Sequence, residues 1–133
     1  MYNVKHITTA IHRAPADVYA FASNPETLPL WAAGLARSEV IKQGDAWVAE
    51  APFGQVTIRF APLNKLGVLD HDVQLESGVV VHNPMRVVPN GAGSEFTFTL
   101  IQQPGMSDQQ FDEDALAVAN DLRTLKTILE SER

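Results

Sequence analysis

His71 is the side chain with the clearest chemical potential, because an imidazole can orient a polar group or move a proton near neutral pH. From position 69 to position 75 the odd positions are Leu, His, Val and Leu, and the even positions are Asp, Asp and Gln. Successive side chains of a strand point to opposite faces, so the pattern predicts that His71 faces the interior. It is there either a core histidine bonded to a carbonyl or water, or a contact for a ligand. The neighbours Asp70 and Asp72 are not expected to join it in a dyad or metal site unless the strand bulges.

The segment 79–88 carries further polar candidates. Valines occupy both of its faces, and Pro84 interrupts any hydrogen-bonded ladder, which indicates a bulge or an edge. Either His82 or Asn83 therefore faces inward. Arg86 is either a solvated surface cation or the charge that meets an acidic ligand, and the rarity of unpaired buried charges favours the surface.

The elements that position these residues begin with an alternating N-terminal strand whose inward residues are Ile7 and Ile11. Pro15 and the apolar spacing after it predict a helix over 16–23. A second short helical segment between two prolines ends near Trp31. Trp31 and Trp47 are large rings that either fill the core or line a cavity.

From 34 to 103, short runs that contain β-branched or aromatic residues alternate with turn residues such as Gly, Pro and Asn. The spacings leave no room for crossover helices, so about six more strands follow in antiparallel hairpins. In the last of them Phe96, Phe98 and Leu100 share the inward face. Apolar residues then recur every three or four positions from Phe111 to Leu129, which predicts a long helix.

The expected fold class is α+β, with a curved antiparallel sheet of about seven strands wrapped around the C-terminal helix, because nothing else in the chain can cover their apolar faces. A curved sheet cannot contact a rigid helix across its whole width, which leaves a candidate pocket. The expected ligand-binding residues are Trp31, Trp47, His71, Asn83, Met85, Arg86, Phe98, Ala115, Val118, Ala119 and Leu122.

Composition limits the possible partners. The chain has 133 residues, a net charge of -6, 45% hydrophobic residues and no cysteine, which predicts a single domain over 1–133 without disulfides and a cytoplasmic location. Its scattered lysines and arginines and its pI near 5.0 argue against nucleic acid. We also expect no signal peptide, membrane insertion, cofactor or metal, since no phosphate-binding glycine loop, nucleophile elbow or histidine pair at metal-binding spacing is present.

Several stretches of the sequence resemble the START-like SRPBCC superfamily, which includes pollen-allergen, lipid-transfer and polyketide cyclase/dehydratase groups. The segment 14–19 looks like the start of its first helix, and 24–31 looks like the segment that closes its pocket. The stretches 67–71, 84–88 and 93–100 are similar to bacterial members described only as SRPBCC or polyketide cyclase-like. The resemblance covers nearly the whole chain and implies a helix-grip fold with a cavity for lipids, sterols, hormones or polyketides.

Three functions are compatible with this sequence. The leading expectation is a monomer or homodimer that binds a small hydrophobic molecule, with His71 orienting one polar group. The second is a cyclase or dehydratase in which His71 is the catalytic candidate and Asn83, Arg86 or Glu50 is its partner. The third is a protein-interaction domain without a cavity.

Overall fold

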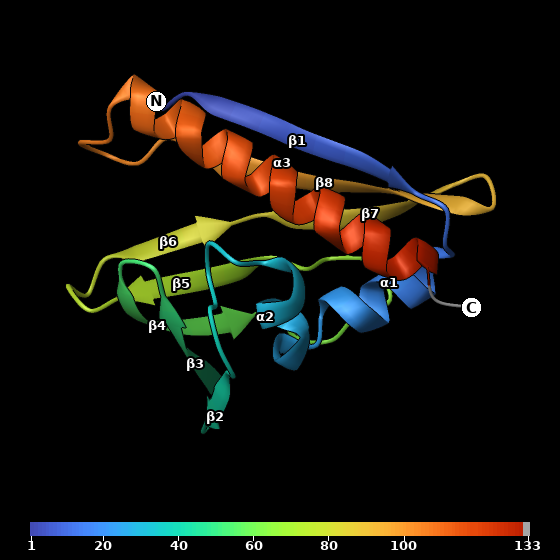
Figure 1. The fold of residues 1–133 in the computed structure, drawn as a ribbon, viewed down its shortest axis with the longest axis horizontal. Helices are drawn as coiled ribbons and strands as arrows, with labels where there is room; N and C mark the ends of the chain where they lie inside the picture. Colours follow the sequence, from blue (N-terminus) through green and yellow to red (C-terminus); the bar gives the residue numbers. More distant parts are fainter. Residues whose placement is uncertain (132–133) are drawn as a thin grey trace.

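The computed structural model describes residues 1–131 and contains eight strands and four helical segments within them (Figure 1). In chain order these are β1 (Val4–Ile11), α1 (Pro15–Ala22), the 3-10 helix η1 (Pro25–Thr27), α2 (Leu28–Trp31), β2 (Ile41–Gln43), β3 (Ala46–Ala51), β4 (Gly54–Phe60), β5 (His71–Leu75), β6 (Val80–Asn83), β7 (Met85–Asn90), β8 (Gly93–Ile101) and α3 (Asp108–Ser131). The predicted α+β class, the early short helices and the long C-terminal helix are confirmed.

The strands form two antiparallel sheets rather than one continuous meander. The orders are β1-β8-β7 in the three-stranded sheet and β2-β3-β4-β5-β6 in the five-stranded one. Pro84 has no amide hydrogen to donate and divides the expected strand 79–88 into β6 and β7. This division raises the strand number to eight, against the expected seven.

The side chain of Asp70 holds the junction between the sheets. Its Oδ1 accepts hydrogen bonds from the Met85 amide at 2.9 Å and from the Arg86 Nε at 3.0 Å. The Arg86 Nη2 donates to Oδ2 at 2.9 Å. On one side of this residue the segment 67–69 pairs with β7, and on the other side β5 pairs with β6. The chain from 67 to 75 therefore belongs to both sheets and bends between them.

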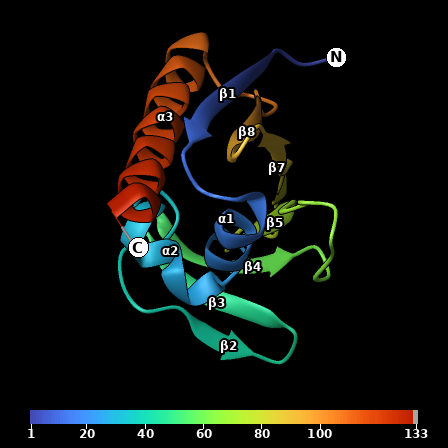
Figure 2. The ribbon, with the colours of Figure 1, turned by 90° about the vertical axis from the view of Figure 1, so that its right-hand side faces the viewer.

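A side-chain cap precedes helix α3, because the Ser107 Oγ accepts a hydrogen bond from the Gln110 amide at 3.1 Å. It runs alongside β1, and α1 and α2 gather beside its C-terminal end (Figures 1 and 2). At that end Leu125 and Leu129 are fully buried in the core. No helix among the described residues combines the length and apolar character that crossing a membrane requires.

The strand registers follow the predicted alternation. Phe96 and Leu100 of β8 are buried, whereas His6 of β1 is exposed. Val73 of β5 is buried together with His71, whose side chain faces inward as predicted. The sequence pattern therefore assigns the inner face of β1, β5 and β8, whereas it left the inner face of the segment 79–88 open.

Gly67 should not tolerate a side chain at the sheet junction, because an added Cβ would lie 2.1 Å from the Val87 carbonyl oxygen. In addition, the φ angle of Gly67 is +75°, a conformation that residues with a side chain rarely adopt. Gly91 has a similar φ of +59° with open space around it, which makes it the matched control. We expect Gly91→Ala to lower the free energy of unfolding by about 1 kcal/mol, and Gly67→Ala to lower it by at least about 2 kcal/mol more. Urea unfolding measures both values, and equal losses would contradict a close approach at Gly67.

Candidate ligand cavity

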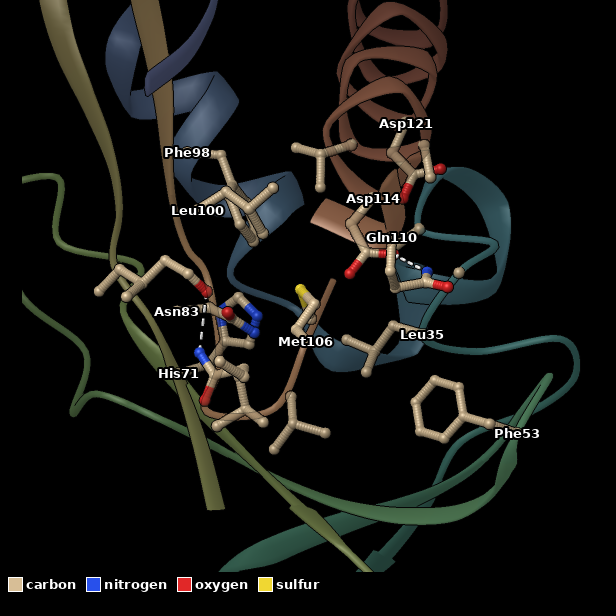
Figure 3. A pocket seen from close by; sticks show the side chains of 18 of the residues that line it. Leu35, Phe53, His71, Asn83, Phe98, Leu100, Met106, Gln110, Asp114 and Asp121 are labelled. Atoms are coloured by element: carbon tan, nitrogen blue, oxygen red, sulfur yellow. Dashed lines mark hydrogen bonds between the residues drawn. The ribbon is translucent and has the colours of Figure 1, made fainter. Parts of the chain in front are cut away.

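A cavity of about 830 Å³ lies between the five-stranded sheet, β7, β8 and α3 (Figure 3). Its apolar wall comes mainly from inward-facing strand residues and from the middle of α3. The β3–β4 turn, the β5–β6 turn and the connection 103–107 also contribute residues to its wall. The residues of the wall are Leu28, Trp31, Ala32, Gly34, Leu35, Phe53, His71, Val73, Leu75, Val79, Val81, Asn83, Met85, Phe98, Leu100, Ile101, Gln103, Pro104, Gly105, Met106, Ser107, Gln110, Asp114, Ala117, Val118, Asp121 and Leu122.

His71 is the deepest polar group of the sheet wall, and its side chain belongs to a residue only 4% exposed. Its Nδ1 lies 3.2 Å from the Leu69 carbonyl oxygen. The ring stacks on Phe60 with centroids 4.9 Å apart and meets Phe98 edge-on at 6.3 Å. Burial lowers the pKa of the imidazole, and the Leu69 carbonyl and nearby Asp70 oppose that shift only in part. A neutral ring that donates from Nδ1 to the carbonyl keeps Nε2 as a hydrogen-bond acceptor for the cavity.

Asn83 is the second polar group of the sheet wall. Of the two residues expected as alternatives, Asn83 therefore faces inward and His82 does not. The β5–β6 register places Asn83 directly opposite His71. His82 instead is exposed, and its Nδ1 lies 2.6 Å from the Asp72 Oδ1. His71 and Asn83 therefore form one polar patch in an otherwise apolar wall.

Helix α3 contributes two carboxylates to the opposite wall. Asp121 is half-buried, and burial raises its pKa to about 6, although hydrogen bonds from the Ala33 and Gly34 amides act in the other direction. Asp114 accepts a hydrogen bond from the Gln110 Nε2 at 2.7 Å. Figure 3 shows these acidic groups across the cavity from His71 and Asn83.

The acidic residues of this wall were missed by the sequence analysis. Asp121 lies three positions after Val118 and four before Leu125, which places it on the apolar side of the predicted helix. An acidic residue inside an apolar stripe was the available signal.

The structure brings seven of the expected residues together around the cavity and leaves four outside it. Those in the wall are Trp31, His71, Asn83, Met85, Phe98, Val118 and Leu122. Those outside it are Trp47, Arg86, Ala115 and Ala119.

Each of the four has a physical reason to lie elsewhere. Trp47 sits opposite Ile58 in the β3–β4 ladder and packs against the core. Arg86 is exposed and held by Asp70 on the outer surface. On α3, positions 112 and 126 bond to β1 through Lys5 and the Ala10 carbonyl. Ala115 and Ala119 share that helical face, so they turn toward β1 and away from the cavity.

Comparisons with known proteins identify the fold. No protein-family model and no curated protein matches the chain. Solved structures do match: XoxI from Bacillus cereus has a TM-score of 0.75 at 13% identity, covering 96% of both chains. The Aha1 dimer from Colwellia psychrerythraea has a TM-score of 0.76 at 14% identity, covering 97% of both chains.

A third match is DynU16, a protein encoded in the dynemicin biosynthetic locus. Its TM-score is 0.71 at 13% identity, and the alignment covers 96% of this chain but 47% of DynU16. Identities this low establish a shared fold and no shared activity. The helix-grip architecture expected from the START-like SRPBCC resemblance is thus confirmed.

The raised pKa of Asp121 has a consequence for stability. The folded state holds this proton more tightly than the unfolded chain, so the stabilisation is complete below the unfolded pKa and is lost as the pH rises through about 6. Asp121→Asn removes that loss. The difference in free energy of unfolding between Asp121→Asn and the natural protein should therefore increase by about 1 kcal/mol, in favour of the variant, from pH 4 to pH 7.5. This is less than the full pKa shift would give, because water still screens the carboxylate. Urea unfolding at both pH values provides the test, and a pH-independent difference would contradict it.

Proposed function

We propose that this protein binds a small, mostly apolar molecule in the cavity between its sheets and α3. The observation that carries the proposal is the cavity itself, which holds about 830 Å³ and has an apolar wall with a few polar groups facing into it. Sites for small molecules share this size, this apolar character and this small number of polar groups. The shared fold with a protein of the dynemicin biosynthetic locus is compatible with a small-molecule role.

The expected affinity follows from the apolar surface a ligand would bury. Removing about 500 Å² of apolar ligand surface from water contributes roughly 12 kcal/mol. Loss of translational and rotational freedom subtracts at least about 4 kcal/mol. The remaining free energy corresponds to roughly micromolar dissociation constants. No chemical step is needed for this function.

A cyclase or dehydratase reaction has less support. Acid–base catalysis by His71 needs a second group within reach of the transferred proton. Arg86 pairs with Asp70, and Glu50 is exposed on β3. Asn83 is adjacent, but its amide does not titrate in this range. A purely protein-binding domain would not require an apolar cavity of this size.

Filling the cavity should abolish binding. Val118→Trp adds a large ring to the wall, so we expect at least a tenfold loss of affinity for the neutral dye N-phenyl-1-naphthylamine, measured by fluorescence titration. Leu116→Trp is the matched control, because Leu116 lies on the same helix, outside the cavity and 68% exposed. It should bind the dye like the natural protein.

Circular dichroism verifies that both variants fold. Failure of the natural protein to bind either the dye or any molecule extracted from its host would overturn the proposal. Equal dye binding by the natural protein and folded Val118→Trp would place the dye elsewhere and would also count against it.

A further inference from the structure

Within residues 1–131, the charged groups that face the cavity are of one sign only. Among the described residues of its wall, Asp114 and Asp121 are acidic and none is Lys or Arg. No lysine or arginine within residues 1–131 forms an ion pair with either carboxylate. The cavity therefore presents negative charge that the protein leaves uncompensated.

The two carboxylates are spaced along the helix wall. They lie seven positions apart, which is about two turns, or roughly 10 Å along the axis of α3. Gln110 and the backbone amides of Ala33 and Gly34 satisfy part of their hydrogen-bonding capacity, but these groups are dipoles and leave the net charge in place. A ligand in the cavity must therefore lie within range of these charges.

The sheet wall supplies an independent sign of a ligand. His71 is 96% buried by accessible surface, its Nδ1 contacts the Leu69 carbonyl, and no hydrogen bond within the described residues engages its Nε2. In the neutral ring Nε2 accepts and cannot donate. Both walls thus offer hydrogen-bond acceptors. The Asn83 amide of the sheet wall can also donate, whereas the Gln110 and Gln103 amides already donate to Asp114 and to the Ile101 carbonyl.

Charge in a mostly apolar cavity acts more strongly than charge in water. A carboxylate head group would lose its hydration and face Asp114 and Asp121 with no cation to pair with. An alcohol would lose less hydration free energy than a carboxylate, because it carries no charge. An ammonium group would pair with a carboxylate and donate the hydrogen bonds that Asp121 accepts.

We propose that the cavity is selective for apolar amines, whose ammonium group pairs with one of the two carboxylates, Asp121 or Asp114, while the apolar body extends toward His71, and that it discriminates against fatty acids. This inference rests on the proposed binding function and specifies its ligand class. A hydroxyl group at the far end of such an amine would donate to the His71 Nε2.

Three ten-carbon probes that differ only in the head group test this selectivity. Decan-1-amine, decan-1-ol and decanoic acid are titrated below their aggregation limits at pH 7.5, and displacement of N-phenyl-1-naphthylamine gives each dissociation constant. We expect decan-1-amine to bind at least about tenfold more tightly than decanoic acid, with decan-1-ol between them. Equal or tighter binding of decanoic acid would overturn the proposal.

Charge-neutral variants identify the responsible group. Asp121→Asn retains acceptor capacity toward Ala33 and Gly34, and it should reduce the ratio of amine to acid affinity at least threefold while leaving decan-1-ol unchanged. Glu113→Gln removes the same charge from the exposed side of the same helix and should leave the ratio unchanged.

The outcomes separate this inference from the proposed function. Binding of decan-1-ol without discrimination between amine and acid would overturn the selectivity alone. An amine-to-acid affinity ratio that stays unchanged in both Asp121→Asn and Asp114→Asn would also overturn the selectivity alone. Absence of binding by the dye and by all three probes would overturn both proposals.

Discussion

The shape of the cavity depends on the junction between the two sheets, where the Asp70 carboxylate takes the place of a backbone carbonyl as hydrogen-bond acceptor. Pro84 cannot donate a hydrogen bond, and the Met85 amide next to it bonds to the Asp70 carboxylate instead of to a backbone carbonyl. The Arg86 guanidinium holds that carboxylate from outside and, by this hydrogen bond, keeps the pKa of Asp70 below its ordinary value. The ladder can therefore change direction without leaving the amide unsatisfied. The two sheets diverge from this point, so α3 closes against β1 and leaves space beside β5.

Helix α3 lies in two different environments along its length, the packed core and the cavity wall. Near its C-terminus, Leu125 and Leu129 are packed in the core. In its middle, Val118 and Asp121 face the cavity. The packed end provides the burial that stabilises the fold, which allows the middle of the helix to keep an apolar space and a half-buried carboxylate beside it. Stability and binding thus rest on different turns of one helix.

Strand and helix periodicity predicted much of this arrangement, because two-residue alternation orients His71 on its strand and the spacing of three or four residues orients Val118 on its helix. It could not decide which side of α3 meets β1, since that depends on packing between distant segments. For this reason Ala115 and Ala119 were expected in the wall and Asp121 was missed. The same limit applied to Arg86, whose partner Asp70 lies sixteen residues away in sequence and becomes its neighbour only at the sheet junction.

Methyl NMR spectra recorded during titration with decan-1-ol are the sharpest test of an internal ligand site, because they locate the bound molecule within the fold. The methyl signals of Val73 and Val118, in the two facing walls, should shift and saturate together. The signals of Leu125 and Leu129 in the packed core should remain nearly unchanged. Shifts confined to exposed residues such as Leu63 and Leu66 would contradict the existence of an internal ligand site.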